Sequence, residues 1–361
     1  MEEKRQLSEK FCSLASNLLL EIWQGGWRLG RGAWASWQSA PGFGEKQEYR
    51  GRVEWRWYNR FLPAHMRLSG ESIPREEWWT WRDHVVHIDR LTNSNAKVVV
   101  MLLHGGGGNG RVLMTLAPML RDLGAEVIAP DLPGYGLTIR RRGFVPSYSL
   151  WADLAADLAA EESARRGLPL IAFGLSLGGL LAYATAARSE AVKGIVATTM
   201  ADTRERSTYL EIARSRVLAA VSMPFLTIAP PAVKRLCIPI RWVAPMERIT
   251  NDPDFSAVFA RDPLAGGSRV ALGFLHSMQK IHIPIEPEAF TDTPVLVAHP
   301  ELDPWTPPDL SRRFFDRIAA EKEWVDLEGC GHLPYEEPGR LQMKDALAGF
   351  LSKIAAQGAV G

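Results

Sequence analysis

Short, β-branched apolar runs alternate with helical stretches from residue 91 to residue 205, and this alternation constrains the fold most strongly. The run KVVVMLL (97–103) is typical of a strand buried on both sides, because it carries no polar face. Strands alternating with helices predict an α/β fold, a mostly parallel sheet with helices on both faces. The expected strands are 84–90, 97–103, 125–129, 170–173, 194–198, 294–298 and 323–327, with 84–90 as an early edge strand. The expected helices are 111–123, 150–166, 178–188, 310–320 and 341–354.

Two stretches do not follow this rhythm. Residues 206–290 contain short apolar helices interrupted by prolines, which predicts a helical cap or lid inserted into a core of residues 81–205 and 291–361.

Residues 1–80 form a Trp-rich N-terminal extension, since nine of the 13 tryptophans fall by Trp81. Within it, Ser8 to Gln24 has the pattern of an amphipathic helix. We expect these tryptophans to pack on the core. The alternatives are a membrane-surface or partner-binding patch, including a homodimer contact.

The overall composition narrows the class of function. The chain is 46% hydrophobic and carries a net charge of +1, so the totals give no reason to expect nucleic acid or an anionic membrane as partner. Cys12, Cys237 and Cys330 are widely spaced and odd in number, which fits neither a disulfide framework nor a paired metal site. Phe11–Trp23 is too short to cross a bilayer and lacks a cleavage site. We therefore expect a cytoplasmic protein without an integral membrane span.

The segment GLSLGG (174–179) places a serine between glycines where an expected strand becomes a helix. Two explanations are open. Small residues let a helix lie close to a sheet, and a serine on a tight turn presents its hydroxyl at the sheet's carboxyl edge. The residues match G-x-S-x-G in the strand–turn–helix context that this nucleophile motif requires. Ser176 is therefore the predicted nucleophile.

A serine nucleophile needs a general base, and the base needs an acid to orient it. His332, in the Gly-rich loop EGCGHLPYEEPG after the last expected strand, is the predicted base among eight histidines. Asp303, in AHPELDPWTPP after strand 294–298, is the predicted acid, and Asp202 is its rival.

Consecutive glycines in LLHGGGGN (102–109) follow a buried strand. A flexible turn or a phosphate cradle is the alternative interpretation, but the glycine patterns of nucleotide-binding loops are absent. We expect an oxyanion hole, with the backbone N–H groups of Gly106 and Leu177 as donors.

These segments together resemble those of α/β-hydrolase-fold serine hydrolases of the esterase or lipase type. HGGGG resembles the family's oxyanion segment, and DLPGYGLT (131–138) the turn after the next strand. GLSLG resembles the nucleophile elbow, LDPWTP the acid loop and GCGH the histidine loop. The resemblance implies acyl transfer to water without a metal or organic cofactor. The same machinery also serves carbon–carbon bond, thioester and amide hydrolases and acyltransferases. A non-catalytic binding protein on this scaffold is the alternative from another class.

The apolar insertion is the only guide to the substrate. Met223, Phe225 and Trp242 are the predicted substrate-binding residues. A lid of this composition favours a small-to-medium, apolar ester.

Overall fold

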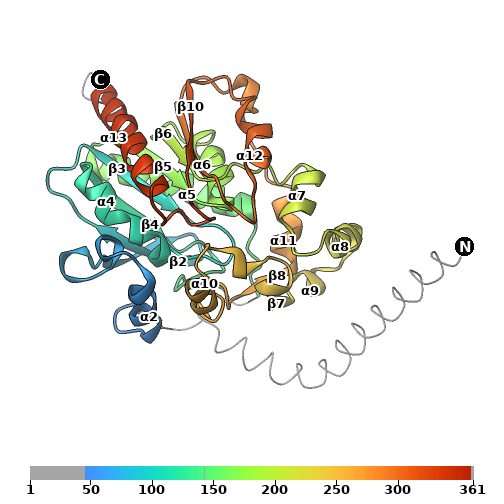
Figure 1. Cartoon of the computed structure of the whole chain (residues 1–361). Coiled ribbons are helices and arrows are strands. Elements are labelled where there is room, and N and C mark those ends of the chain that lie inside the picture. Colours follow the sequence, from blue (N-terminus) through green and yellow to red (C-terminus); the bar gives the residue numbers. More distant parts are fainter. Residues whose placement is uncertain (1–44, 142, 359–361) are drawn as a thin grey trace, which may run out of the picture.

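A computed structural model describes residues 45–141 and 143–358, and its centre is an eight-stranded sheet (Figure 1). The strand order is β1-β2-β4-β3-β5-β6-β9-β10, and only the β1–β2 and β2–β4 pairs are antiparallel. The strands are β1 (Arg75–Trp81), β2 (His84–Leu91), β3 (Val98–Leu103), β4 (Ala125–Pro130), β5 (Leu170–Gly174), β6 (Val192–Ala197), β9 (Val295–Pro300) and β10 (Lys322–Leu327). The expected strands are confirmed within two residues at each end. The placement of 84–90 at the edge is wrong, because β1 pairs along the outer side of β2.

Helices cover both faces of this sheet, as two positions on β6 show. A Cβ on Gly194 would lie 2.9 Å from Phe350 of α13, whereas the Cβ of Ala197 approaches Gly179 of α6. Residues 194 and 197 point to opposite faces because side chains alternate along a strand. The core helices are α3 (Gly110–Leu113), α4 (Ala117–Asp122), α5 (Tyr148–Arg166), α6 (Leu177–Ala186), α12 (Pro308–Phe315) and α13 (Gly339–Gly358).

The segment between β6 and β9 is built mainly of short helices and lies together at the lower right of the sheet in Figure 1. Pro231 and Pro253 start α9 and α10, and Pro224 lies inside α8. These prolines explain why the regular rhythm stops, since proline cannot donate to the preceding helical turn. The elements are α7 (Arg206–Ile212), α8 (Arg216–Ile228), α9 (Pro231–Lys234), β7 (Cys237–Pro239), α10 (Pro253–Phe259), β8 (Arg269–Ala271) and α11 (Leu272–Met278).

Most of the described tryptophans of the N-terminal part pack on the rest of the chain, whereas Trp57 is 41% exposed. Trp79 and Trp81 lie on β1, and their indole N–H groups donate to Glu161 and Asp157 of α5 at 2.7 Å. Helix α2 (Val53–Phe61) packs beside α10, where the Tyr58 hydroxyl donates to Asp262 at 2.9 Å. β1 thus belongs to the sheet, although it falls almost wholly within the expected extension of residues 1–80.

The expected helix Ser8–Gln24 lies outside the described residues. Homodimer contact through the extension stays a prediction. In the part of the chain that the structure describes, no helix combines the length and apolar character needed to span a bilayer.

Candidate active site

Ser176 occupies the turn between β5 and α6, and its backbone is strained. Its φ of 58° and ψ of −128° are values that side chains with a Cβ rarely adopt. Such strain concentrates at functional sites, where the surrounding structure must hold it in place.

The glycines on either side of Ser176 lie where backbone segments pack too closely for a side chain. A Cβ on Gly174 would lie 1.8 Å from the carbonyl oxygen of Gly178, and a Cβ on Gly178 would lie 1.9 Å from that of Leu103. Neither position can accept a side chain without moving backbone. The two explanations of GLSLGG therefore act together, because close packing of α6 on β3 and β5 aims Ser176 into a cavity that it lines.

Asp303 and His332 form a buried hydrogen-bonded pair on the loops that follow β9 and β10. His332 Nδ1 lies 2.7 Å from Asp303 Oδ2. The Thr306 hydroxyl donates to the same carboxylate oxygen at 2.5 Å, and the N–H groups of Trp305 and Thr306 donate to Oδ1. Burial alone would raise the pKa of Asp303, but the His332 charge and these hydrogen bonds lower it to about 2. Asp303 is therefore ionised at neutral pH.

The other imidazole nitrogen, His332 Nε2, has no hydrogen-bond partner among the described residues. The ring of Trp305 lies against the imidazole with centroids 4.7 Å apart, and both Trp305 and Thr306 line the same cavity as Ser176. The structure contains no hydrogen bond between Ser176 Oγ and Nε2. Such contacts are often long in unliganded enzymes and tighten with substrate.

The rival residues have other partners. Asp202 pairs with Arg204 at 2.8 Å. His104 donates from Nδ1 to the Gly105 carbonyl and accepts at Nε2 from Leu132 N–H, so it braces the glycine loop. His299 stacks on Trp324.

The two expected oxyanion donors lie in the same cavity wall. Gly106 and Leu177 both line the cavity, and among the described residues no acceptor pairs with either N–H. A Cβ on Gly106 would lie 3.4 Å from Leu177 Cδ1, so the two segments are adjacent. The turn Gly105–Gly108 closes with a 3.2 Å hydrogen bond and needs φ of +74° at Gly107, which glycine supplies.

A cavity of about 100 Å³, partly open to solvent, extends from Ser176 into the insertion. Its described lining contains no acidic or basic side chain. The lining residues contributed by the insertion include Tyr209, Ile212, Leu218, Ala219, Ile240, Trp242, Val243, Val270, Phe274 and Met278.

Only one of the three predicted substrate-binding residues lines this cavity. Trp242 does so. Met223 is half-buried, and its sulfur accepts from Gln279 at 3.0 Å. Phe225 is 56% exposed on the outside of α8. Apolar composition alone cannot tell which face of a helix turns inward.

The sequence analysis missed Thr306, Trp305 and Tyr135. Trp305 and Thr306 lie in LDPWTP, the segment that contains the predicted acid Asp303, so this segment was the signal for both. Tyr135 lies in DLPGYGLT and lines the cavity, and its buried hydroxyl has no acceptor among the described residues. Burial raises the pKa of Tyr135, so the phenol keeps its proton at neutral pH.

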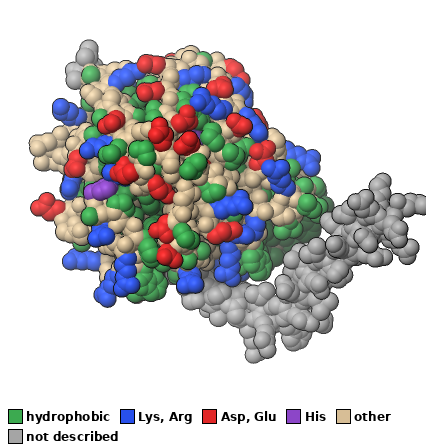
Figure 2. Space-filling model, viewed as in Figure 1, with side chains coloured by type: hydrophobic (Ala, Val, Ile, Leu, Met, Phe, Trp, Pro, Cys, Tyr) green, Lys and Arg blue, Asp and Glu red, His purple; other side chains and the backbone are tan. Residues whose placement is uncertain are grey.

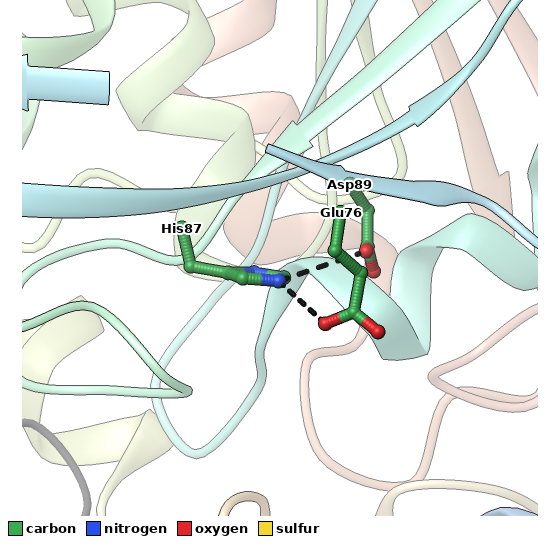
Figure 3. Close-up of side chains that lie close together, drawn as sticks. All are labelled: Glu76, His87 and Asp89. Carbon is green, nitrogen blue, oxygen red and sulfur yellow. Dashed lines mark hydrogen bonds and ion pairs between the residues drawn. The ribbon is translucent and has the colours of Figure 1, made fainter. Parts of the chain in front are cut away.

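A second cluster of titratable groups lies on β1 and β2, where His87 is close to Glu76 and Asp89 (Figure 3). Their ligand atoms are near enough together to suggest a cation site. However, the Arg111 guanidinium already donates to both oxygens of Asp89, at 2.5 and 2.7 Å. Burial alone would lower the pKa of His87, but Asp131 and Glu76 raise it to about 10. Arg111 thus occupies the Asp89 carboxylate, and His87 lies between Glu76 at 2.8 Å and Asp131 at 3.2 Å, so we describe this cluster as an ion network.

Comparison with known proteins identifies the family of this chain. The family model described as "Serine aminopeptidase, S33" matches residues 94–339. The phospholipase YtpA of Bacillus subtilis is 24% identical over 275 residues, which cover 75% of this chain and 98% of that protein. The monoacylglycerol lipase of Paleococcus ferrophilus has a TM-score of 0.57 at 23% identity, over 74% of this chain and 99% of that one. A soluble variant of monoglyceride lipase from Saccharomyces cerevisiae has a TM-score of 0.59 at 18% identity, over 78% and 95%. The chain belongs to this serine aminopeptidase S33 family of α/β-hydrolase-fold enzymes.

Proposed function

We propose that this enzyme hydrolyses a carboxylic ester with an apolar, small-to-medium acyl or alcohol group through an acyl-enzyme. The observation that carries the proposal is the buried Asp303–His332 pair beside a cavity lined by Ser176 and apolar side chains. The lipase and phospholipase relatives support a lipid ester as the substrate class.

In the proposed mechanism, His332 Nε2 takes the proton of Ser176 Oγ as the oxygen attacks the ester carbonyl carbon. Asp303 holds the imidazole by its Nδ1–H and stabilises the imidazolium. The N–H groups of Gly106 and Leu177 bind the oxyanion. The alcohol leaves with the proton from His332, and water repeats the sequence on the acyl-enzyme to release the acid.

The cavity wall favours an ester over a peptide with a free amino terminus. An aminopeptidase substrate presents an ammonium group, which needs an acceptor or a carboxylate when it is buried. The described lining offers no carboxylate. An uncharged acyl chain fits this wall without an unpaired charge.

The amide alternative rests on the family's description as an aminopeptidase. Thioester and carbon–carbon bond hydrolysis and acyl transfer to an alcohol would use the same three residues. A panel of 4-nitrophenyl esters, monoacylglycerols, acyl thioesters, β-diketones and aminoacyl 4-nitroanilides separates these reactions. The proposal expects turnover of medium-chain esters and monoacylglycerols. Cleavage of the anilides alone would replace it with the amide function.

A fluorophosphonate probe tests the machinery itself. We expect it to label the native chain and to leave a Ser176→Ala variant unlabelled. Equal labelling of both proteins would remove Ser176 from the mechanism, and absence of labelling in both would favour the binding-protein alternative.

A further inference from the structure

Helix α8 of the insertion carries large apolar side chains on its outer face. Val217, Val221, Phe225 and Ile228 are 60%, 60%, 56% and 83% exposed. Their spacing of four, four and three residues puts them on one side of the helix, and we call them the α8 stripe. Ala219 and Leu226, on the inner side, are buried. The helix thus has two apolar sides, and only the inner one packs on the protein.

The α8 stripe is the centre of a larger apolar surface. Of the 13 exposed large hydrophobic side chains among the described residues, seven fall between Val217 and Trp242. In Figure 2 hydrophobic atoms gather at the right-hand edge, over α8 and α9. Large exposed apolar patches mark interaction surfaces, because scattered single residues do not produce them.

The same segment has a strongly biased charge. Residues 212–246 contain five basic side chains and no acidic one, although the whole chain has a net charge of only +1. The five are Arg214, Arg216, Lys234, Arg235 and Arg241. Arg214 pairs with Glu247, whereas Arg216, Arg235 and Arg241 are exposed. The net charge of the whole chain is thus close to zero, although the region around the α8 stripe is positive.

The patch is continuous with the mouth of the catalytic cavity. Leu218 and Trp242 are 45% and 54% exposed and also line the cavity. Leu218 and Trp242 therefore connect the exposed apolar surface to the cavity wall.

We propose that the α8 stripe and its basic border dock on an anionic lipid bilayer, from which the cavity draws its substrate. Apolar side chains enter the headgroup boundary, and Lys and Arg side chains pair with anionic headgroups. A second copy of the chain would bring this positive region against another like it, so the charge favours an anionic lipid surface as the occupant. Docking goes beyond the proposed ester hydrolysis, and it can be measured without turnover.

Flotation of the full chain with vesicles tests the proposal. We expect binding to vesicles of phosphatidylcholine with 30% phosphatidylglycerol, about tenfold weaker binding to phosphatidylcholine alone, and loss of binding as salt screens the headgroups. A Ser176→Ala variant should bind as well as the native chain, so failure of the proposed chemistry leaves this result intact. Equal binding to both vesicle types, or to neither, would overturn the proposal.

Two sets of substitutions locate the surface. Val217→Ser, Val221→Ser, Phe225→Ser and Ile228→Ser together should lower vesicle binding about tenfold or more, while cleavage of a water-soluble short ester changes less than about twofold. The matched control joins Val53→Ser, Ile73→Ser and Leu341→Ser, which are exposed apolar residues elsewhere, and it should bind like the native chain. Unchanged binding of the α8 variant would contradict the assignment. So would sedimentation that shows a native dimer and a monomeric α8 variant, because the occupant would then be a second copy.

Discussion

The indole Nε1 of Trp305 donates a 2.8 Å hydrogen bond to the carbonyl oxygen of Ile212 at the end of α7. Its ring also lies against His332. One side chain therefore connects the insertion, the acid loop and the imidazole. A displacement of the insertion at Ile212 would therefore move the Trp305 ring that lies against His332.

Trp305→Phe removes this hydrogen bond and keeps an aromatic ring beside His332. We expect kcat/KM for a soluble ester to fall about fivefold, the equivalent of a net hydrogen bond of about 1 kcal/mol. Steady-state kinetics checks this. Trp324→Phe, on β10, is the control, and a similar loss in that variant would show that tryptophan volume alone is responsible.

Asp303→Asn keeps the shape of the acid but favours the wrong imidazole tautomer. We expect kcat to fall on the order of 10⁴-fold, with little change in KM. Asp202→Asn should retain kcat, because Asp202 pairs with Arg204 and not with His332. A large loss of kcat in Asp202→Asn with normal activity in Asp303→Asn would exchange their roles.

Tyr135→Phe removes only the buried hydroxyl at the cavity wall. Its proton has no acceptor among the residues that the structure describes, so we expect an unchanged or higher Tm and a roughly tenfold lower kcat/KM if substrate supplies the acceptor. Calorimetry and kinetics on the same preparation separate the two effects. A lower Tm with normal turnover would instead indicate a purely structural hydroxyl.

Ser176→Gly should relieve the backbone strain of the elbow. Glycine adopts positive φ freely, so we expect about 1 kcal/mol of added stability in denaturant unfolding, together with loss of hydrolysis. Ser176→Ala removes the same hydroxyl but keeps the Cβ, and it should gain less. Equal stability of the two variants would mean that φ of 58° costs little here.

The ion network on β1 and β2 predicts a loss of stability in alkali. The pKa of His87 is raised to about 10 in the folded chain, from an ordinary value near 6.5. Its contribution is therefore complete below pH 6.5 and is lost as the pH rises through 10. Between pH 6 and pH 9 we expect a decrease on the order of 3 kcal/mol in unfolding free energy.

Denaturant unfolding at several pH values measures this slope. His87→Gln should flatten it, whereas His282→Gln, an exposed histidine, should leave it unchanged. A native curve that is flat from pH 6 to pH 9 would show that His87 is neutral in the fold.

The α/β fold and the order of the candidate site residues along the chain follow from local sequence patterns. Continuous β-branched apolar runs such as Val98–Leu103 are typical of buried strands, and the polar residues that follow parallel strands collect at one edge of the sheet. Ser176, Asp303 and His332 could be proposed because each follows a readable strand.

The surroundings of those residues depend on packing between distant segments and were visible only in the folded chain. It showed that Asp303 rather than Asp202 meets His332. It also showed that Trp242 faces the cavity, whereas Phe225 faces outward. These contacts join residues distant in the chain, and the insertion lacks a simple period that would distinguish its inner face from its outer one. Local patterning specifies elements, and the choice among apolar faces is made only when the elements pack together.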